Sequence, residues 1–245
     1  MSVQTTDVLA LQSADGAQFS AYAARAPQPT GAGVVILPGG RGLLPIYADL
    51  ADRFSEAGID AIAIDHFGRT AGLGLRDNQF DFAPHLAATS PAYTRLDVAT
   101  ALDHLRSTHG DVLRAAFVIG FSFGGAAAFL QATHAEHNLA GAIGCYGWPS
   151  GSEDFAHWPR PVDHAAAYHG ALLGIFGGAD ERISQNEDRQ FDEALAASGT
   201  EHWIVTCDGA PHGFVDRRAK EFPAQSAAAW RRALGFISGL TPDVA

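Results

Sequence analysis

Apolar-rich runs alternate with longer amphipathic segments along most of the 245-residue chain. Runs of this kind, rich in β-branched residues, are typical of strands covered on both faces of a parallel sheet. They lie at Val34–Leu37, Ala61–Ile64, Ala115–Ile119, Leu139–Cys145, Ala171–Phe176 and Trp203–Thr206. The segments between them are predicted to be helices at Ile46–Ala57, Tyr93–Leu105, from the end of the glycine-rich stretch at 120–125 to about His134, Gln185–Ala197 and Ala224–Phe236. This alternation predicts an α/β protein with a mostly parallel central sheet and helices on both faces.

Two shorter apolar runs precede this pattern. Val8–Leu11 and Gln18–Ala23 flank an Asp-Gly pair, which is a strong turn signal, so we expect an N-terminal antiparallel hairpin at the sheet edge. No repeat or shift of composition marks a boundary, and residues 1–245 are predicted to form one domain. Two long irregular stretches, Thr70–Pro91 and Tyr146–Ala165, are predicted to be functional or mobile loops.

Composition narrows the class of partner. Hydrophobic residues make up 47% of the chain and charged residues 18%, as in a globular protein with a large core. A formal net charge of −11 argues against nucleic acid and anionic membranes as partners. The N-terminus lacks the features of a signal peptide, and no apolar run is long enough to span a bilayer. Cys145 and Cys207 form no disulfide framework, so we expect a cytoplasmic protein with reduced thiols.

One motif follows an apolar run directly. Residues 117–125 read Phe-Val-Ile-Gly-Phe-Ser-Phe-Gly-Gly, which places Gly-x-Ser-x-Gly between a predicted strand and a predicted helix. A turn this tight forces its serine into a strained conformation and holds the hydroxyl clear of the sheet. The alternative is an ordinary strand-to-helix turn in which Ser122 only caps the helix. A base and an acid further along the chain would favour the interpretation of Ser122 as a nucleophile.

Such partners follow two later strands. Asp180 comes after Ala171–Phe176, and His212 comes after the last predicted strand. A serine hydroxyl needs a histidine to take its proton, and the histidine needs a carboxylate to fix its tautomer. The order Ser122, Asp180, His212 is the order expected in an α/β-hydrolase. Asp180 has an alternative role as a cap or turn residue, which Gly-Gly-Ala-Asp suits. Its neighbour Glu181 and, as a weaker candidate, Asp208 are the alternative acids.

Further residues are predicted from their place beside this serine. The oxyanion that forms during attack needs hydrogen-bond donors, and we expect the Phe123 amide and an amide of Gly40 or Arg41 to supply them. Arg41 is the preferred anchor for a substrate carboxylate, ahead of Arg69, Arg76 and Arg217. Trp148 and Phe123 are the aromatic residues expected to touch the substrate. His134 and His137 lack nearby partners, and we expect no metal site.

At these motifs the chain resembles the dienelactone hydrolase family of α/β-hydrolases, from Gly33 almost to its end. The resemblance rests on Gly-Phe-Ser-Phe-Gly-Gly at 120–125, Gly-Gly-Ala-Asp at 177–180 and Ala-Pro-His-Gly-Phe at 210–214. The segment Ile64–Arg69 also looks like the family's strand end. The resemblance implies the α/β-hydrolase fold and ester or lactone hydrolysis without a cofactor.

The chain departs from the family pattern at two positions. Family members typically carry a cysteine nucleophile, where this chain has Ser122, and a glutamate where it has Gly39. The two departures are consistent with each other. A thiol can use a second carboxylate as a switch, whereas a serine relies on His212 alone. They leave open the lactone specificity that the family name implies.

The sequence therefore predicts a serine hydrolase that cleaves a small ester or lactone through an acyl-enzyme. A true dienelactone hydrolase, acting on an anionic unsaturated lactone, is one alternative. A non-catalytic ligand-binding relative of the same fold is another. A dinucleotide-binding protein is disfavoured, because neither glycine-rich loop reads Gly-x-Gly-x-x-Gly. The sequence does not predict the oligomeric state.

Overall fold

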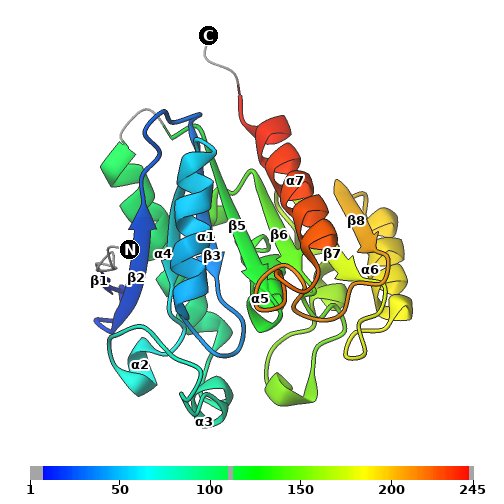
Figure 1. Cartoon of the computed structure of the whole chain (residues 1–245), viewed down its shortest axis with the longest axis horizontal. Helices are drawn as coiled ribbons and strands as arrows, with labels where there is room; N and C mark the ends of the chain where they lie inside the picture. The colour runs from blue at the N-terminus through cyan, green and yellow to red at the C-terminus, as the bar shows by residue number, and fades with distance from the viewer. Residues whose placement is uncertain (1–7, 110–112, 243–245) are drawn as a thin grey trace.

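The central element of the structure, a computed structural model that describes residues 8–109 and 113–242, is one eight-stranded sheet (Figure 1). Its strand order is β1-β2-β4-β3-β5-β6-β7-β8. The strands are β1 Leu9–Gln12, β2 Gln18–Ala24, β3 Ala32–Leu37, β4 Asp60–Ile64, β5 Ala115–Phe121, β6 Gly141–Cys145, β7 Ala171–Gly177 and β8 His202–Cys207.

The sheet is parallel from β4 to β8 and antiparallel at one end. β2 pairs antiparallel with β4, and β1 pairs antiparallel with β2 through a hairpin whose innermost pair is Gln12 and Gln18. The predicted hairpin at the sheet edge is therefore confirmed. Every residue of β3 to β7 is buried, as their continuous apolar runs require. In contrast, β8 has only half-buried and exposed residues, because it lies at the other edge.

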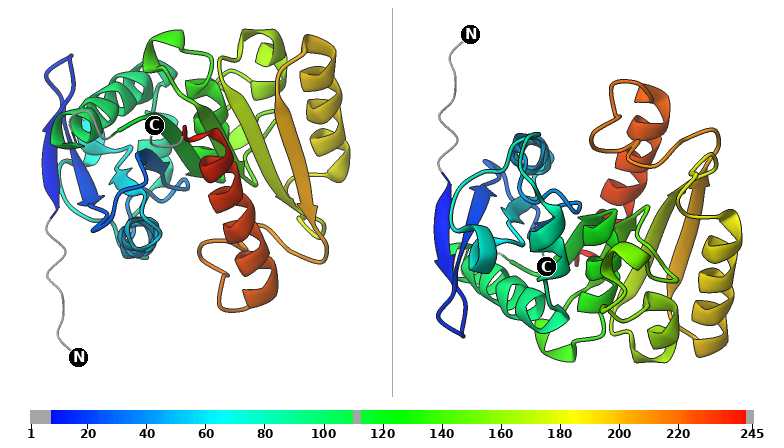
Figure 2. Two further views of the ribbon diagram at one scale, coloured as in Figure 1. Left: turned by 90° about the horizontal axis from the view of Figure 1, so that it is seen from above. Right: turned by 90° about the horizontal axis from the view of Figure 1, so that it is seen from below.

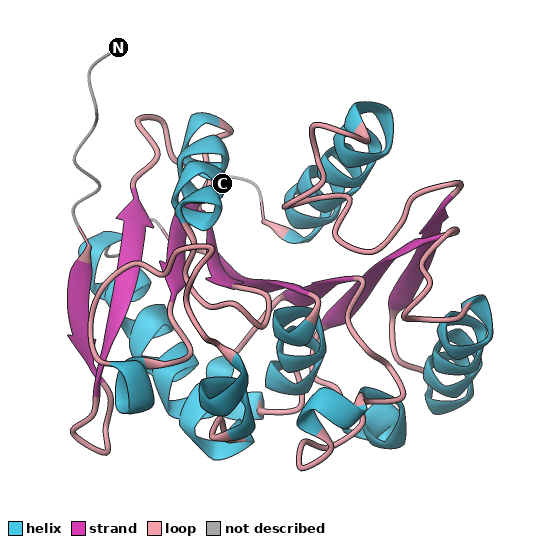
Figure 3. Cartoon of the chain, turned by 60° about the horizontal axis from the view of Figure 1, so that its bottom comes forward, coloured by secondary structure: helices cyan, strands magenta, loops and turns pink. Residues whose placement is uncertain are grey.

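Helices cover both faces of the sheet, as predicted. α1 and α7 lie on one face, and α4, α5 and α6 lie on the other (Figures 2 and 3). The helices are α1 Pro45–Glu56, α2 Gly68–Ala71, α3 Ala83–Ala87, α4 Pro91–His109, α5 Phe123–Gln131, α6 Gln185–Ser198 and α7 Pro223–Leu240, with short 3₁₀ turns η2 Ala135–His137, η3 Glu153–Phe155 and η4 Pro161–Ala167. None of the helices in the described part of the chain is long and apolar enough to cross a membrane.

The structure differs from the sequence-based expectation mainly at element ends and in the loops. The helix expected to continue to about His134 ends at Gln131, where the Thr133 hydroxyl bonds to the Leu130 carbonyl at 2.7 Å. The two long irregular stretches contain short helices, namely α3 in the first and η3 and η4 in the second. These short helices have only three to seven residues each, too few to show a helical period of apolar positions in the sequence.

The strand order creates the crevice in which a site can form. From β3 the chain passes through α1 to β4 on one side, and it later returns through β5 on the other side of β3. The loops that follow β3 and β5 therefore leave the sheet in opposite directions. Open α/β sheets bind ligands at such a reversal, outside the carboxyl ends of the strands. That edge is the lower one in Figure 1.

A buried charge network ties the N-terminal hairpin to α4. Asp97 of α4 is 3% exposed and accepts hydrogen bonds from Ser13 in the hairpin turn and from Arg69 of α2, the latter at 2.7 Å. The Arg69 guanidinium also contacts Asp15 at 3.0 Å. Arg69 is thereby bound to two carboxylates in the fold, so it is not the substrate anchor that the sequence analysis considered.

We expect Arg69→Ala to lower the free energy of unfolding by about 2–4 kcal/mol, because it leaves the buried Asp97 carboxylate without its cation. The control is Arg160→Ala, which breaks an exposed pair with Asp163 at 2.7 Å and should cost less than about 1 kcal/mol. Urea unfolding followed by circular dichroism measures both. Equal losses in the two variants would show that the network does not stabilise the fold.

Candidate active site

Ser122 lies in the turn between β5 and α5 with a backbone that few non-glycine residues adopt. Its φ is 54° and its ψ is −118°. The backbone crossing at this turn is close: a Cβ on Gly120 would lie 1.8 Å from the Gly124 carbonyl oxygen, and one on Gly124 would lie 2.2 Å from the Leu37 carbonyl oxygen. Only glycine fits at both positions, which is the physical reason for the Gly-x-Ser-x-Gly spacing.

The structure brings Ser122, His212 and Asp180 into one hydrogen-bonded chain. Ser122 Oγ lies 2.8 Å from His212 Nε2, and His212 Nδ1 lies 2.8 Å from Asp180 Oδ2. The side chains of His212 and Asp180 are 9% and 2% exposed. Each residue follows a different strand, so the carboxyl ends of β5, β7 and β8 supply the three side chains. The arrangement can move a proton from the serine to the imidazole.

Asp180 is held so that one oxygen faces the histidine. Its Oδ1 accepts the backbone N–H groups of Arg182 at 2.8 Å and Ile183 at 3.1 Å, which leaves Oδ2 for His212. Because the carboxylate accepts, His212 carries its proton on Nδ1 and presents an unprotonated Nε2 to the serine. The competing carboxylates Glu181 and Asp208 are exposed.

Aromatic rings hold the imidazole in place. The Tyr146 ring centroid lies 5.0 Å from that of His212, and the Trp148 centroid lies 5.7 Å from it. Tyr146 is fully buried and has a φ of 39°, a second strained position directly after β6. No pattern in the sequence points to this role for Tyr146, because the strained backbone comes from the packing between strands.

The loop after β3 presents backbone amides beside the serine. The Gly42 N–H donates to the Gly39 carbonyl at 3.0 Å, which closes a turn with Gly40 and Arg41 at its centre. Within the described residues, the amides of Gly40 and Arg41 make no hydrogen bond. Phe123 begins α5, and the first amides of a helix lack partners within that helix. Gly40, Arg41 and Phe123 all line the pocket that contains Ser122.

This pocket is a small cavity of about 140 Å³ over the serine. The loops Thr70–Pro91 and Tyr146–Ala165 form its rim, and they are joined to each other through Thr89. His157 Nε2 bonds to the Thr89 carbonyl at 2.9 Å, and Trp158 Nε1 donates to the Thr89 hydroxyl at 3.1 Å. The lining residues are Gly39, Gly40, Arg41, Leu44, Tyr47, Phe82, Leu86, Ser122, Phe123, Trp148, Asp154, Phe155, Arg182, Asp216 and Arg217.

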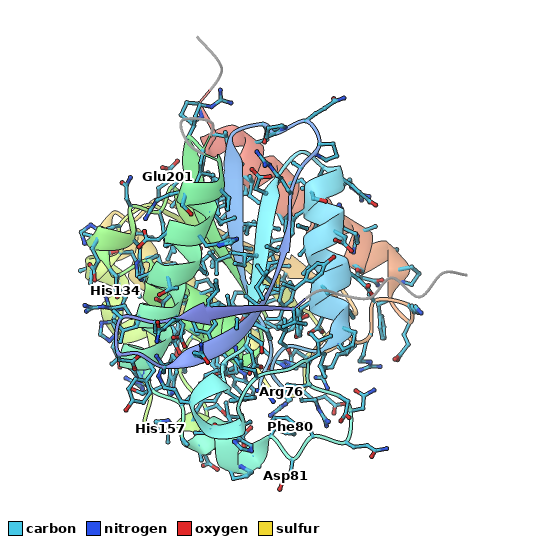
Figure 4. All side chains as sticks on the ribbon, turned by 90° about the vertical axis from the view of Figure 1, so that its left-hand side faces the viewer. Arg76, Phe80, Asp81, His134, His157 and Glu201 are labelled. Carbon is cyan, nitrogen blue, oxygen red and sulfur yellow. The ribbon has the colours of Figure 1, made fainter. Side chains whose placement is uncertain are left out.

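Arginines divide into pocket and structural groups. Arg76 is 7% exposed, pairs with the fully buried Asp65 at 2.7 Å and stacks over Phe80 at 5.0 Å (Figure 4), so it belongs to the fold. Arg41 and Arg217 line the pocket, and neither guanidinium forms an ion pair with any residue that the structure describes. Arg182 also lines the pocket, stacks 4.9 Å over Trp148 and was not singled out from the sequence.

Both thiols and two further histidines, His66 and His137, are buried or half-buried outside the hydrogen-bonded chain of Ser122, His212 and Asp180. Burial raises the pKa of Cys145 well above its usual value, and burial also raises the pKa of Cys207. His66 Nε2 lies 2.8 Å from the Pro38 carbonyl. Burial, with a smaller effect from His134, lowers the pKa of His137 to about 4. Across residues 8–109 and 113–242, no cluster of three or more His, Cys, Asp or Glu could hold a metal ion.

Comparison of the sequence with known proteins gives a family and relatives. The family model described as the dienelactone hydrolase family matches residues 19–240. A relative from Escherichia coli (strain K12) is 29% identical over 229 residues, which cover 91% of this chain and 83% of that protein. The carboxymethylenebutenolidase of Rhodococcus opacus is 28% identical over 222 residues, covering 86% of this chain and 83% of that enzyme.

Comparison of structures gives the fold. The dienelactone hydrolase-like promiscuous phosphotriesterase P91, from metagenomic libraries, superposes with a TM-score of 0.74 at 19% sequence identity. The match covers 96% of this chain and 99% of that one. Together with the strand order, this likeness confirms the predicted α/β-hydrolase fold.

Asp188, in the first turn of α6, yields a prediction about pH. It is 4% exposed, and its Oδ1 has no hydrogen-bond partner among the described residues. Burial, with the charges of Asp180 and Glu187, raises its pKa from 3.8 to about 7. A raised carboxyl pKa contributes stability that is complete below about pH 4 and is lost as the pH rises to about 7.

We therefore expect Asp188→Asn to be more stable than the wild type at about pH 8, by about 4 kcal/mol, and to keep less than half of this advantage near pH 5. Urea unfolding at both pH values measures the difference. An advantage of the same size at both would show that Asp188 does not titrate in this range.

Proposed function

The chain belongs to the dienelactone hydrolase family and is a hydrolase of carboxylic ester bonds, and from this premise we propose that it cleaves a small ester or lactone with Ser122 as nucleophile. The observation that carries the proposal is the chain of two 2.8 Å hydrogen bonds from Ser122 through His212 to Asp180. A helix-capping serine would need neither partner.

In the first half of the reaction, Ser122 Oγ attacks the carbonyl carbon and its proton passes to His212 Nε2. Asp180 keeps the Nδ1 proton oriented and stabilises the imidazolium by its charge. The oxyanion receives hydrogen bonds from the amides of Phe123 and of Gly40 or Arg41. When the intermediate collapses, the leaving alkoxide takes the proton from Nε2, and the acyl group remains on Ser122.

In the second half, water attacks the acyl-enzyme. His212 takes a proton from this water at Nε2, the tetrahedral intermediate forms again, and its collapse returns the proton to Ser122 Oγ. The carboxylic acid leaves. For a lactone, the alkoxide released in the first half stays attached to the acyl group, so one hydroxy acid is the product. All steps use groups of this chain and water.

The cavity limits the size of the substrate. A volume of about 140 Å³ is close to that of an engineered cavity that accommodates benzene. Its walls near the serine include Leu86, Phe123, Trp148 and Phe155, which favour a short apolar acyl or alcohol group. We infer that short esters and small lactones are hydrolysed faster than long-chain esters.

A second candidate, a dienelactone hydrolase acting on an anionic unsaturated lactone, is favoured by a separate observation. Arg41 and Arg217 line the pocket without a carboxylate partner among the described residues, although the whole chain carries a formal charge of −11. A guanidinium that lines a pocket and has no carboxylate partner is suited to bind a substrate carboxylate in a bidentate way. Trp148, under Arg182, would then contact the ring of the substrate.

We expect Ser122→Ala to lower kcat/KM for a short-chain p-nitrophenyl ester by about 10³-fold or more, because the reaction loses its nucleophile. The wild type should also react covalently at Ser122 with a fluorophosphonate probe, and Ser122→Ala should not. Release of p-nitrophenol and intact-protein mass spectrometry measure the two effects.

The half-buried Ser55, in α1, supplies a matched control, because Ser55→Ala removes a hydroxyl outside the pocket. It should leave turnover and labelling unchanged. Undiminished turnover by Ser122→Ala would exclude Ser122 as nucleophile, and an unlabelled, inactive wild type would favour the non-catalytic alternative.

The second candidate predicts a difference between substrates. Arg41→Ala and Arg217→Ala should raise KM for a lactone bearing a carboxylate by about 10-fold or more, since a hydrogen bond to a charged group contributes about 1.5–3 kcal/mol. KM for the corresponding neutral lactone should change little. Arg160→Ala, outside the pocket, is the control. Equal effects on both lactones would exclude a carboxylate-binding role.

A further inference from the structure

The peptide unit between Pro38 and Gly39 is held at both ends. The Pro38 carbonyl oxygen lies 2.8 Å from His66 Nε2, and the Gly39 N–H donates to the Tyr47 hydroxyl at 2.8 Å. Because a carbonyl only accepts, His66 must carry its proton on Nε2 in this contact. A peptide unit is planar, so fixing its oxygen and its N–H fixes its orientation.

The Tyr47 hydroxyl that receives the Gly39 amide is itself held by a buried carboxylate. It donates to Asp216 Oδ2 at 2.8 Å, while Asp216 Oδ1 accepts the backbone N–H of Arg217 at 2.6 Å. Tyr47 and Asp216 are 2% and 6% exposed. Burial and the Asp216 charge raise the pKa of Tyr47 well above its usual value, so the phenol stays protonated and can donate.

This hydrogen bond joins α1, which directly follows the loop after β3, to the loop after β8. Tyr47 belongs to α1, directly after the loop that carries Gly40 and Arg41, and Asp216 lies four residues after His212 on the loop that follows β8. The pair is therefore connected to the amides expected to bind the oxyanion and to the loop that carries the base. Both side chains line the pocket.

Glycine makes the loop dependent on such support. Gly39 and Gly40 lack side chains that could anchor the turn, and glycine has the largest backbone freedom to lose on ordering. A Cβ on Gly39 would lie 3.2 Å from the Tyr47 hydroxyl and 3.8 Å from Ser122 Cβ. The backbone thus approaches the tyrosine closely, and the hydrogen bond from the Gly39 amide fixes where the next two amides point.

We propose that Tyr47 and Asp216 are positioning residues for the oxyanion site: through the Gly39 amide they hold the Gly40–Arg41 turn in the geometry that receives the developing charge. The inference rests on the proposed function, because it assigns a task within that reaction. Donors held in place before the reaction stabilise the transition state more than the bound substrate, so their loss should appear in kcat.

The principal test is Tyr47→Phe, which keeps the buried ring and removes the hydroxyl. We expect kcat for a short-chain ester to fall about 10- to 100-fold, less than the roughly 10²- to 10³-fold loss that follows removal of an oxyanion donor itself, with KM little changed. The inhibition constant of phenylboronic acid, which forms a tetrahedral adduct with a serine hydroxyl, should rise by the factor by which kcat/KM falls.

The chain offers a matched control in Tyr22→Phe. The Tyr22 hydroxyl donates to Asp52 Oδ1, also a carboxylate contact to α1 and also 2.8 Å long, but neither residue lines the pocket. A general loosening of α1 would therefore lower kcat in both variants. Thermal unfolding of each variant shows that it is folded at the assay temperature.

Variants of Asp216 test whether the pair acts as a unit. Asp216→Asn keeps an acceptor oxygen for Tyr47 and should lose less activity than Asp216→Ala. The double variant Tyr47→Phe/Asp216→Ala should lose about as much activity as the more damaging single variant, because both changes break the same support of the Gly39 amide.

Three results would overturn the inference: an unchanged kcat and boronate inhibition constant in Tyr47→Phe, a raised KM with unchanged kcat, or losses that multiply in the double variant. The second would make the pair a substrate contact. Fluorophosphonate labelling of wild-type Ser122 separates this failure from that of the proposed function. If wild-type Ser122 is labelled and the wild type hydrolyses the ester, the proposed function stands whatever the result for Tyr47→Phe. If the wild type is neither labelled nor active, both proposals fail.

Discussion

The close backbone crossing around Ser122 is the constraint on which the other parts of the site depend. Gly120 and Gly124 allow β5, α5 and the end of β3 to approach within distances that no Cβ tolerates. The strained serine exists only because this packing over-determines it. With the turn fixed, the first amides of α5 and the loop after β3 necessarily face the same cavity, and side chains from the later strands can reach it.

The local patterns of the sequence were enough to predict most of the fold. Buried strands such as β3 and β5 are readable because every residue in them is covered, and the Asp-Gly turn signal sufficed for the hairpin. Ser122, Asp180 and His212 could be proposed because each directly follows a strand, where topology alone gathers side chains. Their catalytic roles stay a prediction, while their hydrogen bonds are features of the structure.

What the sequence could not reveal are contacts that depend on distant pairs. Tyr47 and Asp216 are 169 residues apart, and neither carries a local signal of the other. The arginines illustrate the same limit: Arg69 and Arg41 both follow strands, but only the packed chain shows that carboxylates from the hairpin and α4 surround the first and that the second lines the cavity. Sequence gives the candidates, and long-range packing decides among them.

The joint at Thr89 has a consequence for how this pocket can change over evolutionary time. Both rim loops meet at that residue, one through its own backbone and hydroxyl and the other through His157 and Trp158. An insertion or deletion in either loop displaces the shared contact and leaves polar groups of the other without partners. The two loops therefore have to change together: a new pocket shape requires matching substitutions in both loops, while the sheet and the turn that carries Ser122 stay the same.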